Sequence, residues 1–136
     1  PEALQRLEGT LARNPNDASV LMQIGMIHSA RGDQKKAKES YERLLKNNPN
    51  YSPALNNLAY IHSEQLGDLD TAFEYAQKAR KLRPKDPHTS DTLGWIVFKR
   101  GEYAWAQSLI AESAEKLPDE PEVQYHLGMS HYGAVI

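Results

Sequence analysis

LMQIGMIHSARGDQKKAKESYERLLKNNP, residues 21–49, is the stretch of this 136-residue chain that decides its fold. Leu21, Ile24 and Gly25 lie three and four residues apart, which is the spacing of one face of an α-helix. Gly32 follows, and glycine readily takes the left-handed conformation in which helices end. A second run with helical spacing comes next, and the closing proline stops it. The stretch therefore predicts two helices joined by a glycine turn.

The small and helix-ending residues of this stretch recur with one period along the whole chain. Successive members of each series are 34 or 35 residues apart, and every 35-residue interval contains residues 59–67. The series are the prolines Pro15, Pro49, Pro84 and Pro118, the small residues Gly25, Ala59, Gly94 and Gly128, the alanines Ala3, Ala37, Ala72 and Ala106, and the turn glycines Gly32, Gly67 and Gly101. A fixed period of this length predicts stacked repeats, in which each unit buries its apolar face against its neighbours.

The order of these slots resembles the tetratricopeptide repeat. In each unit an apolar residue precedes the small residue, a bulky slot follows three positions later, and the turn glycine, the alanine and the proline come in the same order. The bulky slot departs from the usual aromatic residue and holds His28, His62, Val97 and His131. The resemblance implies an all-α fold, a right-handed superhelix of stacked antiparallel helix pairs. The chain also looks like bacterial multi-repeat proteins, often tied to the cell envelope, so its compartment stays open between cytoplasm and envelope.

Side chains at the predicted helix starts and crossings support this reading. Asp17 can cap the first helix of residues 18–51, and Ser52 and Asp86 each precede a proline, the usual order of a cap and the first helical residue. We expect Gly94, like the other members of the small-residue series, to lie where two helices cross closely.

The repeat slots divide the chain into three whole repeats flanked by two halves. Residues 18–51, 52–86 and 87–120 carry both helices, whereas 1–17 match only a second helix and 121–136 only a first helix. We interpret the chain as a piece of a longer protein, and we expect the half-repeat ends to support head-to-tail homo-oligomers. The side chains expected to lack cover at these ends are Leu4, Leu7, Leu11, Leu127, Met129, His131 and Val135.

Composition and motif spacing argue against several classes of function. The formal net charge of -2 argues against a general nucleic-acid binder, no apolar run approaches a membrane span, and there are no cysteines. His88, Ser90 and Asp91 are too close together on one helix start to converge as a catalytic triad. The histidines of the bulky slot are interpreted as packing residues because no helix carries a metal-ligand pair. We therefore expect no enzyme activity, no cofactor and no metal.

The first helices of such repeats line a concave groove in which protein segments commonly lie. The leading hypothesis is therefore a non-enzymatic scaffold that holds an extended or helical protein segment in that groove. The predicted groove residues are Met22, Met26, Asn56, Asn57, Tyr60, Asp91, Trp95, Lys99, Tyr125, His126 and Met129. The alternative for each residue is packing between adjacent first helices. A clamp for a carboxylate terminus, known in some members of the family, is not expected, because only Asn57 occupies a clamp slot.

Two other features leave alternatives open. Trp105 and Leu109 lie four residues apart on the usually polar side of a second helix, and they predict either a convex contact site or an incidental apolar spot. A basic run from Arg80 to Lys85 is either a solvated helix end or a site for an anionic partner.

A self-assembly module and a regulatory arm of a larger enzyme are the alternative functions.

Overall fold

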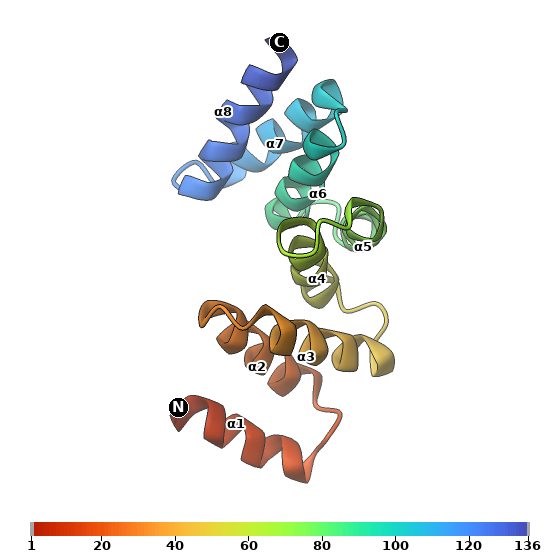
Figure 1. Cartoon of the computed structure of the whole chain (residues 1–136), viewed down its shortest axis with the longest axis vertical. Coiled ribbons are helices and arrows are strands. Elements are labelled where there is room, and N and C mark those ends of the chain that lie inside the picture. Colours follow the sequence, from red (N-terminus) through yellow and green to blue (C-terminus); the bar gives the residue numbers. More distant parts are fainter. Residues whose placement is uncertain (1, 136) are drawn as a thin grey trace.

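The computed structural model describes the backbone of residues 2–135 and the side chains of residues 2–133. All regular secondary structure in that part of the chain is α-helical. The helices are α1 (Glu2–Arg13), α2 (Ala18–Ala30), α3 (Gln34–Asn47), α4 (Ser52–Glu64), α5 (Leu69–Leu82), α6 (Pro87–Lys99), α7 (Tyr103–Lys116) and α8 (Pro121–Val135). Figure 1 shows them stacked in chain order, with the two termini at opposite ends of the stack. The predicted all-α solenoid of stacked helix pairs is confirmed.

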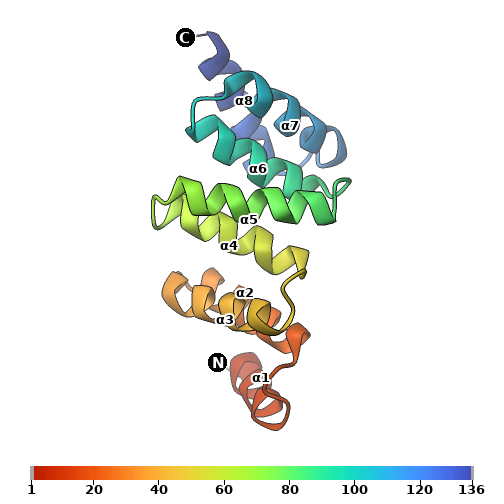
Figure 2. The ribbon, with the colours of Figure 1, turned by 90° about the vertical axis from the view of Figure 1, so that its right-hand side faces the viewer.

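The helices pack as hairpins that stack on one another. The most extensive contacts join α2 with α3, α4 with α5, and α6 with α7, and Figure 2 shows these pairs crossing the long axis of the stack. We call α2, α4, α6 and α8 the first helices, and α1, α3, α5 and α7 the second helices. The first helices α4 and α8 also pack directly on α6. The first helices therefore line one side of this part of the array, and the second helices line the other.

The turns and most helix starts follow the sequence prediction. The backbone φ angles of Gly32, Gly67 and Gly101 are 79°, 64° and 88°, so each turn uses the left-handed conformation that favours glycine. The side chain of Asp17 accepts a hydrogen bond from the Val20 amide, and α3, α5 and α6 also begin at a capping aspartate.

The predicted cap at Ser52 is wrong. Tyr51 is the N-cap of α4 and makes no side-chain cap bond, while Ser52 is already helical. The Ser52 hydroxyl is buried and donates a hydrogen bond to the carbonyl oxygen of Ala79, 3.1 Å away in α5. The hydroxyl therefore joins α4 to α5 instead of closing its own helix.

The close helix crossings lie at two of the small residues. A Cβ atom on Gly94 would lie 2.6 Å from Cγ1 of Ile110 and 3.1 Å from Cβ of Leu109, both in α7. A Cβ atom on Gly25 would overlap the ring of Tyr41 in α3. Ala37, like the other alanines of its series in α5 and α7, is fully buried. The absence of side-chain volume at these sites lets each pair of helices approach closely.

Gly128, in the same slot of α8, meets nothing within 4 Å, because α8 is the last described helix. The crossing that its slot predicts is thus not made within the described residues. Gly133 has the opposite character, since an added Cβ would lie 2.6 Å from the ring of Phe98. Val135, expected at the uncovered end, has a side chain outside the described residues. The head-to-tail contact stays a prediction.

Burial is concentrated in the third hairpin. Nine of the thirteen residues of α6 are buried, whereas α1 has no fully buried residue.

None of the helices within residues 2–135 combines the length and the apolar character that crossing a membrane requires.

The bulky slot of the first helices places its histidines in three different environments. His62 is buried against the ring of Tyr75, and neither of its ring nitrogens has a hydrogen-bond partner among the described residues. His28 is half-buried, and His131 is exposed and lies 2.7 Å from the side-chain nitrogen of Gln107. Burial lowers the pKa of His62, and the charge of Lys38 adds to this effect, while Asp68 opposes it.

Gly94→Leu is expected to destabilise the array severely, by about 3 kcal/mol or more, because the new side chain would force α6 and α7 apart. The matched control is Gly128→Ala, which meets open space and should leave stability unchanged or raise it by up to about 1 kcal/mol through helix propensity. Urea unfolding followed by circular dichroism measures both. Equal midpoints for Gly94→Leu and the wild type would contradict the close crossing.

His62 should make the array less stable in mild acid. Because its folded pKa is lowered, the unfolded chain takes up the proton more readily, so stability falls as pH falls through the ordinary histidine value of about 6.5. His62→Phe should remove part of the loss measured between about pH 7.5 and pH 5.5. His131→Asn, at the exposed position of the same slot, is the control and should retain the wild-type pH dependence.

Candidate functional site

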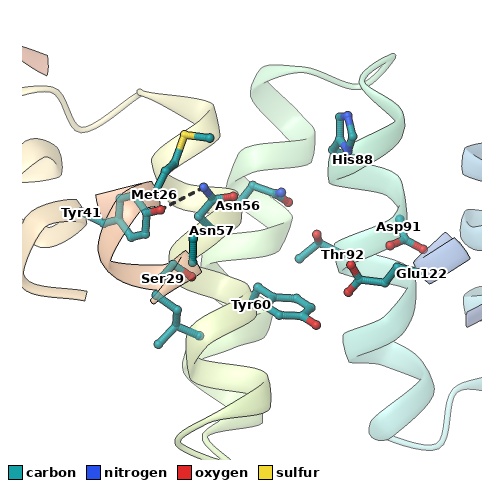
Figure 3. Close-up of a pocket in the computed structure, with 12 residues that line it drawn as sticks. Met26, Ser29, Tyr41, Asn56, Asn57, Tyr60, His88, Asp91, Thr92 and Glu122 are labelled. Carbon is teal, nitrogen blue, oxygen red and sulfur yellow. Dashed lines mark hydrogen bonds between the residues drawn. The ribbon is translucent and has the colours of Figure 1, made fainter. Parts of the chain in front are cut away.

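A groove of about 430 Å³ lies on the first-helix side, between α2, α4, α6 and the start of α8. We call it the first-helix groove. Its apolar and aromatic lining consists of Met26, Ala30, Tyr41, Tyr60 and Ile61. Its polar lining consists of Ser29, Asn56, Asn57, His88, Asp91, Thr92 and Glu122. Figure 3 shows these side chains converging from helices that are far apart in the sequence.

Helical spacing explains why α4 contributes so much of the groove. Asn57 and Tyr60 are three residues apart in the sequence, and Asn56 and Tyr60 are four apart. The three residues therefore share the face of α4 that is turned away from α5. Asp91 and Thr92 follow Asn56 and Asn57 after one repeat of 35 residues and occupy the same face of α6. Successive first helices therefore extend one polar row along the groove.

Tyr41 enters this groove from the second helix α3, which sequence reasoning missed. Its ring passes the backbone of Gly25, where any side chain would block it. The Tyr41 hydroxyl accepts a hydrogen bond from Nδ2 of Asn57 at 3.2 Å, drawn as a dashed line in Figure 3. Burial raises the pKa of Tyr41, and the bond with Asn57 opposes the rise. The phenol thus remains neutral and fixes the Asn57 amide at the groove wall.

Asn56 presents a buried hydrogen-bond acceptor to its surroundings. Its Oδ1 atom is buried and has no hydrogen-bond partner among the described residues. A buried acceptor without a partner costs about 1–3 kcal/mol.

The end of the groove near α8 is acidic. Asp91 and Glu122 line it, and Figure 3 shows the ring of Tyr60 reaching from α4 toward Glu122. Burial raises the pKa of the Tyr60 hydroxyl, and the nearby carboxylates of Glu122, Glu64 and Asp91 raise it further. The hydroxyl is therefore protonated, and the groove combines a neutral phenol with negative charge.

Trp95 and His126 do not line the groove; the structure places them in the packing between α6 and its neighbours. Trp95 is 8% exposed, stacks on His126 at 4.1 Å between ring centroids, and donates a hydrogen bond to Glu64. His126 is 3% exposed, and its Nδ1 lies 3.0 Å from Oδ1 of Asp91. Lys99 pairs with Glu64 at 3.0 Å. For these residues the packing alternative describes their position.

The other predicted residues are dispersed. Met26, Asn56, Asn57, Tyr60 and Asp91 meet in the groove, whereas Met22 packs on the core between α2 and α4. Tyr125 is exposed beside Trp95, and Met129 is half-buried outside the lining.

Leu109 is buried against Gly94, so of the convex pair only Trp105 is exposed. Glu122 was missed, although it repeats the slot of His88 after 34 residues, and this register could have revealed it. Within residues 2–133 no group of three histidine or carboxylate side chains is arranged to hold a metal ion.

Trp95→Ala is expected to cost about 3–5 kcal/mol of folding stability, because it leaves a cavity between α6 and α8 and removes the partner of Glu64. Tyr60→Ala should cost much less, because Tyr60 is 38% exposed. Urea unfolding compares the two variants. Equal losses would mean that Trp95 lies on the surface, as the sequence reading placed it.

The comparisons with known proteins agree with this architecture. A sequence model described as tetratricopeptide repeat matches residues 22–87. A TPR repeat-containing protein of Pseudomonas aeruginosa is 30% identical over 127 residues, which are 93% of this chain and 21% of that protein. The photosystem I assembly protein Ycf3 of Sorghum bicolor is 40% identical over 119 residues, covering 75% of this chain and 68% of Ycf3.

Among solved structures, the crystal structure of MamA protein superposes with a TM-score of 0.77 at 18% identity, covering 96% of this chain and 71% of MamA. The chain spans about a fifth of the length of the Pseudomonas relative. Periodicity, helix pairing and these similarities lead to the same assignment: the chain belongs to the tetratricopeptide repeat family.

Proposed function

We propose that this chain is a protein-interaction scaffold that holds an extended segment of a partner protein in the first-helix groove. The observation that carries the proposal is the groove of about 430 Å³ itself, in which the exposed side chains of Met26 and Tyr60 lie beside the Asn56 and Asn57 amides. The backbone N–H and C=O groups of an extended segment can form hydrogen bonds with the polar side chains of such a groove wall. The neighbouring Asn57 is already held in place by Tyr41, so the segment would meet a pre-organised wall.

The apolar part of the groove supports contact with side chains of the segment. Met26 and Tyr60 are 52% and 38% exposed, so both offer apolar surface that the fold leaves uncovered. Methionine adapts to side chains of different shape, and tyrosine provides a large contact area at a low entropic cost. These two residues flank the Asn56 and Asn57 amides, so backbone and side-chain contacts would form together.

The charge of the groove favours a segment with a basic side chain near α8. Glu122 is exposed, and the Asp91 carboxylate is held by His126 at the same end. A lysine or arginine placed beside Tyr60 would be attracted to these carboxylates and could donate hydrogen bonds to them. A segment with acidic residues at this place would be repelled.

The relatives support a scaffold role in general terms. Ycf3 is described as an assembly protein, and its similarity covers three quarters of this chain. The whole relatives extend beyond the matched region, so the partner of this chain is identified here only by its chemistry.

Peptides selected from a random displayed library on the immobilised chain should be enriched in lysine or arginine beside apolar residues. Tyr60→Ala should weaken their binding roughly thirtyfold, about 2 kcal/mol, because exposed aromatics in grooves act as hot spots. Glu122→Gln should weaken a basic peptide about fivefold and leave its alanine-substituted counterpart unaffected. Fluorescence anisotropy with synthetic peptides measures both effects.

Tyr125→Ala is the matched control, because Tyr125 is an exposed tyrosine on a first helix outside the groove lining. It should change affinity less than threefold, within the range of near-neutral interface positions. Equal binding by the wild type and Tyr60→Ala would place the binding site elsewhere.

A further inference from the structure

A second hollow lies on the other side of the array, between the second helices α5 and α7. It has a volume of about 610 Å³, and Leu93 of α6 forms part of its lining. We call it the second-helix furrow. Residues from two features that were separate in the sequence line it together, namely Trp105 of α7 and the basic residues at the end of α5. The stacking of first helices explains its position, because α4, α6 and α8 pack directly while α5 and α7 leave space between them.

Trp105 supplies apolar surface at one end of the furrow. It is 38% exposed, and its ring meets that of Phe73 edge to face at 6.0 Å between centroids. Arg100 lies over the Phe73 ring at 4.2 Å, which holds this aromatic group in place. The slot of Trp105 contains Lys36 in the first repeat and Thr71 in the second, so repeat packing does not require an aromatic residue there.

The α5 side of the furrow is positively charged. Lys78 and Lys81 lie one helical turn apart, both are exposed, and neither forms an ion pair within residues 2–133. Arg80 is already engaged, since its Nη1 donates to the Ser90 hydroxyl at 2.6 Å and its Nη2 lies 3.5 Å from Glu112. The furrow thus retains two unpaired ammonium groups beside an exposed indole.

We propose that the second-helix furrow binds an acidic segment of a partner protein that carries an apolar side chain. The apolar side chain packs on Trp105, and carboxylates pair with Lys78 and Lys81. Burial of the indole provides most of the affinity, and the lysines select the sign of charge. The site is independent of the first-helix groove, whose acidic end selects the opposite charge.

A protein segment fits the furrow better than a nucleic acid does. The carboxylate of Glu74 lines the furrow, and Glu112 lies at its Arg80 end, so a continuous phosphate backbone would meet negative charge there, whereas the separate carboxylates of a peptide can be spaced to meet only Lys78 and Lys81. The indole of Trp105 offers an apolar surface that a leucine or phenylalanine side chain can bury.

The probe for this site is a short fluorescein-labelled peptide in which glutamates flank a pair of leucines. We expect fluorescence anisotropy to show binding in the range of about 10–100 µM at low salt, and weaker binding as salt rises. The same peptide with lysines in place of glutamates should bind at least tenfold more weakly. Binding of the two peptides with equal affinity would overturn the proposal, as would absence of binding up to about 1 mM.

Two variants test the residues. Lys81→Glu should weaken the acidic peptide about tenfold, whereas Lys46→Glu, an identical charge change in the same slot of α3, should leave it within twofold. Trp105→Ala should also weaken binding of the peptide about tenfold. Lys81→Glu should retain the wild-type melting curve, which separates its loss of binding from a loss of folding.

Tyr60→Ala should leave the acidic peptide unaffected, so failure of the groove proposal and failure of this one give different results. Equal effects of Lys81→Glu and Lys46→Glu would show non-specific attraction and overturn the furrow. Tighter binding of a labelled single-stranded oligonucleotide than of the acidic peptide, lost in Lys81→Glu, would also overturn it in favour of a nucleic-acid partner.

Discussion

The close approach of a first and a second helix at a residue with no side chain is the constraint on which the rest of this structure depends. At Gly94 it brings α6 against Ile110 and Leu109 of α7. At Gly25 it does more, because the space lets the Tyr41 ring extend from α3 to the opposite side of the array. The same feature that sets the hairpin geometry thus delivers a second-helix side chain to the first-helix groove. The contact between Gly25 and Tyr41 therefore belongs both to the helix packing and to the binding surface.

The two sides of the array differ in charge although they share the same helices. On the first-helix side, Asp91 and Glu122 make one end of the groove acidic, while on the second-helix side Lys78 and Lys81 make the furrow basic. The chain is nearly neutral overall, so this separation is a matter of placement and not of composition. A repeat architecture permits it, because surface residues of each unit vary while the crossing residues stay small.

The fold was predictable because each packing slot is repeated along the chain, so an exception such as His62 in a bulky slot hardly weakens the pattern. The groove was predictable only in part. Asn57 and Tyr60 were found because helical spacing fixes their face, but Trp95 was misplaced because its burial depends on His126 and Glu64, which belong to other repeats. A period says which face a residue occupies, and it does not say whether a neighbour covers that face. The predicted helix cap at Ser52 was wrong for a related reason, since the hydrogen-bond partner of its hydroxyl lies in α5.

Because the helices are unevenly buried, the free energy of local opening differs from one helix of this chain to another. The backbone hydrogen bonds of α1 are protected by no fully buried side chain, whereas those of α6 lie within the densest part of the core. Local opening therefore requires the least free energy at the N-terminal end, and amide hydrogen exchange there is decoupled from global unfolding. None of the residues that line the groove or the furrow belongs to α1. Molecules in which α1 has transiently unfolded consequently keep both the groove and the furrow. Partner binding at these surfaces therefore does not require α1 to be folded.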